Sequence, residues 1–291
     1  MKDAKLRCPC CSEIIWNQIA LTGPEKVDVY WYFCRCGFLF HNTPIDLSKV
    51  YTAEYRAKRE DMKFLKERLN YYVRCYAQII EEKVWGRKML DVGYTTPLLM
   101  QEFEKRGWLT CGVDLIPSEE YLSMDFMSTE FDEALSTFDK DGKVVSRERF
   151  DLIWMGDFLQ SLKDPVKAIY KAYDLLNPNG ILVIITPNTD LIRRNVIPAW
   201  GHWSMEDNQS FINERILREA LIKCDASFNG RMEVLYFDKS NQSTRFTSWN
   251  NMHMIAQKTK IEESIFEKGE IADKLAEQND TDNQQPQIQT P

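Results

Sequence analysis

The 291-residue sequence contains no uninterrupted apolar run of the about 18 to 20 residues that a membrane-spanning helix requires. Its N-terminal stretch, MKDAKLRCPCC, lacks the apolar segment of a secretory signal peptide. Runs rich in Lys and Arg are also missing, and the net charge of −7 argues against a general nucleic-acid binder. These absences predict a soluble, cytoplasmic protein with no membrane partner, for which nucleic acid is an unfavoured partner.

Glycine-rich nucleotide-binding loops are absent as well. The chain has 12 glycines, and they form neither a G-x-G-x-x-G fingerprint nor a P-loop. A pyrophosphate-bearing cofactor such as NAD or FAD is therefore disfavoured, because its phosphates require close approach of backbone amides. The composition, with 44% hydrophobic and 28% charged residues, is nevertheless that of a chain able to bury a core.

Cysteine is concentrated at one end of the chain, because five of the eight cysteines fall within the first 36 residues. Residues 8–11 form a C-x-x-C pair, and residues 34–36 form a C-x-C pair beyond a β-rich stretch. Two such pairs can close a tetrahedral zinc site, and the metal adds folding energy that about 45 residues cannot obtain by burial alone. We expect one structural zinc ion with the ligands Cys8, Cys11, Cys34 and Cys36.

Alternatives to this ligand set stay open. Cys10 is a spare thiol that can substitute for Cys11. His41, four residues beyond Gly37, is a candidate ligand, although its position fits a cap on the edge of the module better. A redox pair and unliganded thiols are the remaining interpretations of the cluster.

From residue 88 onward, apolar strands alternate with amphipathic helical segments, which is the pattern of a parallel α/β sheet. The expected strands are 88–93, 110–116, 121–126, 150–155, 181–186, 233–237 and 252–256. The expected helices are 54–84, 97–106, 165–176 and 213–223, with an insertion or irregular helix at 130–149. The predicted domains are a zinc-ribbon-like module (1–45), a linker helix (46–86), an α/β domain (87–260) and a charged, partly disordered tail (261–291).

Candidate binding residues follow the first two expected strands. In an open α/β sheet, ligands bind at the carboxyl ends of the strands, near the topological switch point. The segment 91–97 (DVGYTTP) leaves the first strand and is therefore expected to touch a cofactor. Asp114 ends the second strand, where a carboxylate is placed to accept both ribose hydroxyls of an adenosine-containing ligand.

Residues 88–114 and 150–188 resemble class I S-adenosylmethionine-dependent methyltransferases of the small-molecule type. The family pattern LDVGxGxG corresponds to residues 90–97, GVD to 112–114 and FDLI to 150–153. Residues 175–188 (LLNPNGILVIITPN) match the family's LLxPGGxLxxxTPN. The resemblance implies S-adenosylmethionine as cofactor and an α/β fold with a Rossmann-like, seven-stranded class I methyltransferase sheet, preceded here by a small N-terminal zinc-binding module.

The resemblance also assigns roles around the first two strands. Asp91 and Gly93 would line the methionine end of the cofactor. Thr95 departs from the family's glycine, and we expect its hydroxyl to bind the amino-acid portion of the cofactor. Asp114 would bind the ribose. The alternative for Asp91 is a strand-end carboxylate that ties down loop amides.

Further along the chain, Asp125 and Phe126 would face the adenine. Met155 would close the pocket from the fourth strand, together with residues 156 and 157. A solvated loop position is the alternative for Asp125. Trp154 and Phe158 are expected in the core rather than in the cofactor wall.

The sequence departs from the family pattern in two places. Thr95 and Pro97 replace the second and third glycines of the first loop, and Gln160 and Ser161 replace a Glu-His pair after the fourth strand. If that histidine is the base in relatives, this chain needs another one. His202, between two tryptophans, is the candidate catalytic base, and a structural role within the tryptophan packing is its alternative.

These patterns predict methyl transfer to a small-molecule or sugar-type acceptor. Glu206 and Asp157 are the alternative proton acceptors if His202 is not the base. The eroded glycine loop favours a rival hypothesis, a degenerate methyltransferase-fold protein that acts as an interaction module. A nucleic-acid methyltransferase is a third hypothesis, weakened by the acidic charge and by the lack of an N/D-P-P-Y/F motif. No pattern identifies the acceptor or the oligomeric state.

Overall fold

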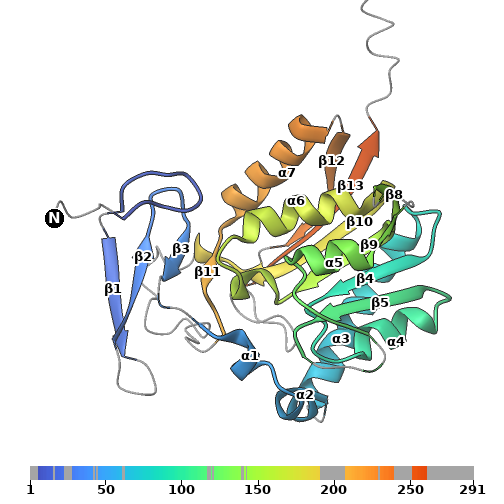
Figure 1. The fold of residues 1–291 in the computed structure, drawn as a ribbon, viewed down its shortest axis with the longest axis horizontal. Helices are drawn as coiled ribbons and strands as arrows, with labels where there is room; N and C mark the ends of the chain where they lie inside the picture. Colours follow the sequence, from blue (N-terminus) through green and yellow to red (C-terminus); the bar gives the residue numbers. More distant parts are fainter. Residues whose placement is uncertain are drawn as a thin grey trace, which may run out of the picture. The chain divides into compact units, whose positions relative to one another are not determined.

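A seven-stranded sheet forms the centre of the chain in a computed structural model, with the strand order β12-β13-β10-β9-β4-β5-β6 (Figure 1). Its strands are β4 (Lys88–Val92), β5 (Leu109–Asp114), β6 (Leu122–Ser123), β9 (Phe150–Gly156), β10 (Leu176–Pro187), β12 (Gly230–Asp238) and β13 (Asn251–Lys260). Every strand expected from the sequence is present, with shifted ends. The predicted Rossmann-like, seven-stranded sheet is confirmed.

The structure describes residues 6–15, 17–22, 28–41, 43, 45–60, 63–116, 119, 121–138, 141, 143–190, 207–228, 230–238 and 251–260. Residues 1–259 belong to one compact unit.

The strand directions locate the ligand crevice. Strands β6, β5, β4, β9 and β10 pair in parallel, whereas β13 pairs antiparallel with β10. The chain runs outward from β4 to β5 and β6 and then returns to the other side of β4 through β9. The topological switch point therefore lies between β4 and β9, and ligands are expected above the carboxyl ends of these strands.

Helices cover both faces of the sheet (Figure 1). One face packs against α3 (Lys63–Glu81) and α4 (Leu98–Glu104). The opposite face packs against α5 (Thr129–Ala134), α6 (Pro165–Leu175) and α7 (Glu214–Phe228). A parallel strand buried on both faces needs apolar side chains at successive positions, which explains the continuous apolar run in β10. Among the described residues, no helix is both long and apolar enough to cross a membrane.

The segments before the sheet and within its insertion are also helical in part. Helices α1 (Leu47–Val50) and α2 (Ala53–Glu60) precede α3, so α3 and all of α2 except its first residue fall inside the helix predicted over 54–84. The expected insertion contains α5 and a hairpin of β7 (Ser136–Phe138) and β8 (Val144–Arg147).

The N-terminal strands form a second sheet. Strands β1 (Asn17–Thr22), β2 (Asp28–Phe33) and β3 (Leu39–His41) pair antiparallel. A fourth strand, β11 (Ser210–Phe211), pairs antiparallel with β3 and lies beside it in Figure 1. Buried Trp31 stacks on Phe211, with ring centroids 5.3 Å apart. Residues far apart in the sequence therefore complete one small sheet.

Candidate functional site

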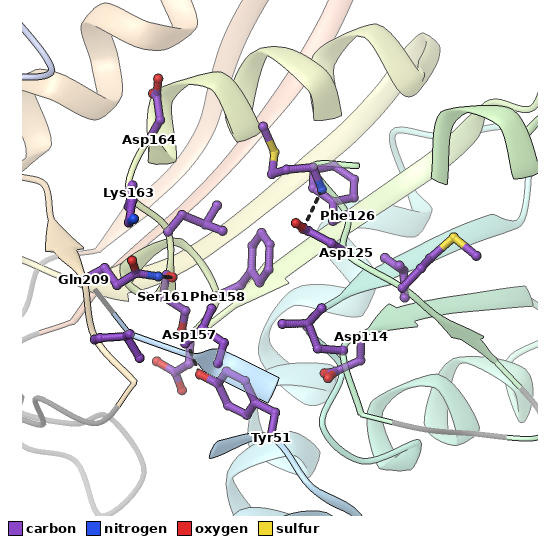
Figure 2. Close-up of a pocket in the computed structure, with 18 of the residues that line it drawn as sticks. Tyr51, Asp114, Asp125, Phe126, Asp157, Phe158, Ser161, Lys163, Asp164 and Gln209 are labelled. Carbon is purple, nitrogen blue, oxygen red and sulfur yellow. Dashed lines mark hydrogen bonds between the residues drawn. The ribbon is translucent and has the colours of Figure 1, made fainter. Parts of the chain in front are cut away.

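Two cavities, of about 440 Å³ and about 290 Å³, open above the carboxyl ends of β4, β5 and β9. They share four lining residues, so together they form one crevice with two compartments. Figure 2 shows the larger compartment, with Asp114 and Asp125 on one side and Asp157, Phe158 and Ser161 on the other. The shared residues are Tyr51, Gly93, Thr95 and Asp157.

The loop after β4 keeps a glycine-like backbone even where glycine is replaced. Gly93 has φ +71°, and a Cβ atom there would lie 2.7 Å from Cδ2 of Phe158, so glycine is required. Thr95, which stands at the second glycine of the family pattern, has φ +46°. Left-handed backbone is costly for a β-branched residue. The loop therefore keeps this conformation despite the backbone strain at Thr95.

Asp114 ties this loop to the neighbouring strand. Its Oδ2 accepts a hydrogen bond from the Thr95 amide at 3.0 Å, and its Oδ1 accepts one from the Ile116 amide at 2.8 Å. The side chain is buried and lines the larger compartment. Burial raises the pKa of Asp114 above its ordinary value, because desolvation outweighs the stabilising backbone hydrogen bonds.

Asp91 lies deeper in the crevice and lines the smaller compartment. Its carboxyl group is buried, and desolvation, followed by repulsion from Asp114, raises its pKa well above 3.8. Asp114 thus lines the larger compartment and Asp91 the smaller one, close enough for their charges to interact.

The loop after β6 supplies the far wall of the larger compartment. Asp125 and Phe126 both line it, as expected from the sequence. The Oδ1 atom of Asp125 accepts a hydrogen bond from the Met127 amide at 2.8 Å, which fixes the loop (Figure 2). Phe126 is almost fully buried and meets Phe158 edge-on, with ring centroids 5.9 Å apart. Phe158, expected in the core, also lines the compartment.

Met155 does not reach the crevice. Its side chain is fully buried in the core on the α6 side of the sheet, and it lines neither compartment. Trp154 and Gly156 line the smaller compartment instead. Successive residues of a strand point to opposite faces, so Trp154 and Met155 cannot share one wall. Trp154 and Gly156, the neighbours of Met155, therefore lie in the wall where Met155 was expected.

The turn after β9 carries Asp157, which the sequence predicted in the pocket wall and also offered as an alternative proton acceptor. Asp157 has φ +53° and forms an ion pair with Arg68 of α3, with Oδ2 and Nη2 3.1 Å apart. Its Oδ1 accepts a hydrogen bond from Asn251 at 3.2 Å. Arg68 lines the smaller compartment. No local sequence signal predicted that this arginine of the linker region reaches the site.

The predicted base His202 and its alternative Glu206 lie outside the described residues. The chain resumes beside the crevice, where Gln209 lines the larger compartment and its Nε2 donates to the Ser161 carbonyl at 2.5 Å. His253 packs in the core, where its Nδ1 and the Tyr76 hydroxyl are 2.6 Å apart. His253 therefore has a structural place in the core.

The four cysteines predicted as zinc ligands do come together. Their Sγ atoms lie within 4.8 Å of one another, with Cys8 and Cys36 3.7 Å apart and Cys11 and Cys34 3.4 Å apart. Hydrogen bonds from the thiols of Cys10 and Cys8 lower the pKa of Cys36, while burial raises the pKa of Cys34 to about 11. Cys10 lies beside the cluster but is not one of the four.

His41 is not part of the thiol cluster. Its Nε2 lies 2.8 Å from the carbonyl oxygen of Asn208, and its ring packs edge-on against Trp31. The histidine therefore joins the N-terminal sheet to the segment that resumes at residue 207. This arrangement agrees with the expectation of a cap rather than a ligand.

The second cysteine pair contacts the main domain directly. The Cys36 carbonyl accepts a hydrogen bond from Arg215 of α7 at 3.1 Å, and the Gly37 carbonyl accepts one from Thr189 at 2.8 Å. Gly37 has φ +100°, and a Cβ there would collide with Asn213. The cysteine turn thus packs against Thr189 on one side and against Asn213 and Arg215 on the other.

The comparisons with known proteins agree with this geometry. The profile of a family described as a methyltransferase domain matches residues 57–225. A solved structure from Burkholderia thailandensis, 1,6-didemethyltoxoflavin-N1-methyltransferase with bound 1,6-didemethyltoxoflavin and S-adenosylhomocysteine, is similar at a TM-score of 0.50 and 12% identity. The similarity covers 79% of this chain and 99% of that one, and it shows a shared fold.

Two curated relatives are named ubiquinone biosynthesis O-methyltransferase. The one from Actinobacillus pleuropneumoniae serotype 5b (strain L20) is 27% identical over 126 residues, which cover 40% of this chain and 52% of the relative. The one from Rhodopseudomonas palustris (strain HaA2) is 26% identical over 113 residues, which cover 35% of this chain and 41% of the relative. This chain thus spans about half the length of the curated relatives it matches.

Proposed function

The chain belongs to the methyltransferase domain family, and from that premise we propose that it transfers a methyl group from S-adenosylmethionine to a small-molecule acceptor. The larger compartment would hold the cofactor and the smaller one the acceptor. Both volumes suit small molecules, since ligand pockets commonly measure about 300 to 1,000 Å³. The cofactor would supply an electrophilic methyl group on a sulfonium centre.

Asp114 carries this proposal. Two backbone amides orient its carboxylate at the carboxyl end of β5, in the wall of a compartment with otherwise largely apolar surroundings. A carboxylate in this place is suited to accept hydrogen bonds from the two hydroxyls of a ribose. The glycine-poor loop is compatible with such a ligand, because a cofactor without phosphates needs no cradle of backbone amides.

The remaining cofactor contacts follow from the walls of the crevice. Gly93 and Thr95 line both compartments, where the methionine portion would sit, and Asp91 lines the smaller one. Phe126 would pack against the adenine, with the carboxylate of Asp125 at its edge. Thr95 retains the role proposed from the sequence, a hydroxyl donor toward the amino-acid portion of the cofactor.

The acceptor is proposed to be a small molecule because the relatives are named for such reactions. The curated relatives are named as O-methyltransferases and the structural relative as an N1-methyltransferase. His202 stays the catalytic base predicted from the sequence, and Asp157 is the alternative proton acceptor that lines the crevice. A rival function, an interaction module without cofactor, is favoured by the strained Thr95 in place of glycine.

We also propose that the thiol cluster binds one structural zinc ion. A tetrahedral site with Zn–S bonds of about 2.3 Å has sulfur–sulfur edges of about 3.8 Å. The observed 3.7 Å and 3.4 Å separations and the 4.8 Å limit for the whole set fit that geometry. Four thiolates leave no open coordination position, so the ion would stabilise the N-terminal sheet rather than act on substrate.

Isothermal titration calorimetry with S-adenosylhomocysteine tests the main proposal. We expect one site per chain and a loss of affinity of at least about tenfold in Asp114→Ala, because charge-assisted hydrogen bonds are lost. The control is Glu133→Gln, which removes an exposed carboxylate of α5 outside the crevice and should bind normally. Folded, zinc-loaded protein that binds no S-adenosylhomocysteine would contradict the proposal and favour the interaction module.

A further inference from the structure

Asp157 stands where the two compartments meet. It is one of the four residues that line both, and among these four it alone carries a carboxylate. If the proposed function is correct, the transferred methyl group must cross from one compartment to the other at this boundary. The inference that follows rests on that proposed function and adds a residue to it.

The backbone holds Asp157 at the boundary in an unfavourable conformation. A φ of +53° is uncommon for a residue other than glycine, although Asp and Asn tolerate it better than most. The Asp157 amide donates to the Ile185 carbonyl at 2.8 Å, and its carbonyl accepts from Gln160 Nε2 at 2.8 Å. Both backbone groups are satisfied, so the turn is stably held. Such conformations cluster at functional sites.

The carboxylate itself is anchored but not saturated. Arg68 contacts Oδ2 at 3.1 Å, and Asn251 donates to Oδ1 at 3.2 Å. A carboxylate offers about four lone-pair positions, and these two contacts occupy one on each oxygen. The Asp157 side chain remains 32% exposed, compared with 17% for Arg68. Each oxygen therefore keeps an acceptor position for a ligand in the crevice.

We propose that the Asp157 carboxylate faces the transferred methyl group and accepts the proton of the acceptor's nucleophilic atom, with Arg68 and Asn251 as positioning residues. As the nucleophile's electron pair forms the new bond to the methyl carbon, the carbon–sulfur bond breaks and its electrons remain on sulfur. The proton of the nucleophile passes to an oxygen of Asp157. Charge is conserved, because the sulfonium cation and the carboxylate anion are both neutralised.

A cofactor analogue tests this placement without any acceptor. Sinefungin carries an amine at the position of the transferred methyl group, whereas S-adenosylhomocysteine has no group there. Its ammonium would form a charge-assisted hydrogen bond with Asp157. We expect Asp157→Asn to lower sinefungin affinity by at least about tenfold and S-adenosylhomocysteine affinity by less than about twofold, measured by calorimetry. Asparagine suits the left-handed backbone, so the variant should fold.

Asp174→Asn is the matched control. Asp174 forms an Asp–Arg pair of the same 3.1 Å length with Arg147, its side chain is 36% exposed, and it lines neither compartment. We expect this variant to bind both ligands as the wild type does. Equal losses of sinefungin and S-adenosylhomocysteine in Asp157→Asn, or no loss of either, would overturn the assignment. Failure of the wild type to bind S-adenosylhomocysteine would instead overturn the proposed function itself.

A second measurement separates Asp157 from His202. Wild type, Asp157→Asn and His202→Gln are each incubated with methyl-labelled S-adenosylmethionine and a small-molecule metabolite extract, and labelled product is followed from pH 6 to 9. We expect labelling to fall by about a hundredfold or more in Asp157→Asn, the scale of a lost general base. Wild-type rates in Asp157→Asn, with a comparable loss only in His202→Gln, would assign the base to His202.

Discussion

Gly93→Ala should damage both the fold and the cofactor site, and its cost can be worked out from two separate contributions. The first is backbone strain, because φ +71° costs an L-residue about 1–2 kcal/mol. The second is a collision of the new methyl group with Phe158, 2.7 Å from its Cδ2, where overpacking costs about 1–3 kcal/mol. The free energy of unfolding should therefore fall by about 2–5 kcal/mol.

Gly107→Ala isolates the backbone contribution. Gly107 also has a left-handed backbone, at φ +82°, but nothing lies within 4 Å of its added Cβ. This variant should lose only about 1–2 kcal/mol. The effect of glycine on the unfolded chain is common to both substitutions and cancels in the comparison. The difference of about 1–3 kcal/mol then measures the contact with Phe158.

Denaturant unfolding of both variants, followed by calorimetry with S-adenosylhomocysteine, provides the assay. Phe158 lines the larger compartment, so Gly93→Ala should also weaken ligand binding, whereas Gly107→Ala should not. In a Phe158→Ala background, Gly93→Ala should lower the free energy of unfolding by less than it does in the wild type, because the colliding ring is gone. Equal destabilisation by Gly93→Ala and Gly107→Ala would show that the contact between residue 93 and Phe158 adds no cost of its own, and would refute this prediction.

Three further predictions concern single groups. Thr95→Gly should raise the free energy of unfolding by up to about 1 kcal/mol in a denaturant titration, because relief of left-handed strain exceeds the added chain entropy; a loss of stability would contradict this. Asp91→Asn should raise the melting temperature at pH 7. Burial favours the protonated carboxyl, so ionisation destabilises the fold as pH rises through the raised pKa, and the gain from Asn should vanish below the ordinary value of 3.8; a pH-independent gain would refute that cause. Metal analysis should find one zinc ion per chain, retained in Cys10→Ser and lost when Cys34→Ser and Cys36→Ser are combined; retention in the double variant would exclude this ligand set.

The central sheet was predictable because its signals are local. Each strand is a short apolar run bounded by turn residues, and each run reports its burial without reference to distant parts of the chain. The position of Asp114 followed in the same way, since the end of a strand can be read from the sequence and the carboxyl ends of parallel strands meet at one edge. The cysteine spacing likewise identified the four thiols that the structure brings together.

The orientation of side chains within a buried strand was not predictable. Trp154 and Met155 are adjacent apolar residues in a strand covered on both faces, so hydrophobic periodicity cannot tell which one faces the crevice. The packing of α3 and α6 on opposite faces settles it, with Trp154 in one core cluster and Met155 in the other. The role expected for Met155 depended on which of these two side chains faces the crevice, and the sequence does not show this.

Contacts between distant segments were decided by the tertiary structure alone. The ion pair of Arg68 with Asp157 joins a helix before the sheet to a turn after its fourth expected strand. The hydrogen bond from Arg215 to Cys36 spans 179 positions of the chain. Sequence patterns arise from neighbours along the chain, whereas such pairs arise from how helices and strands pack. The sequence by itself therefore determined the sheet, the position of the Asp114 carboxylate at the end of β5 and the thiol cluster, and the packing determined which other side chains meet at the crevice.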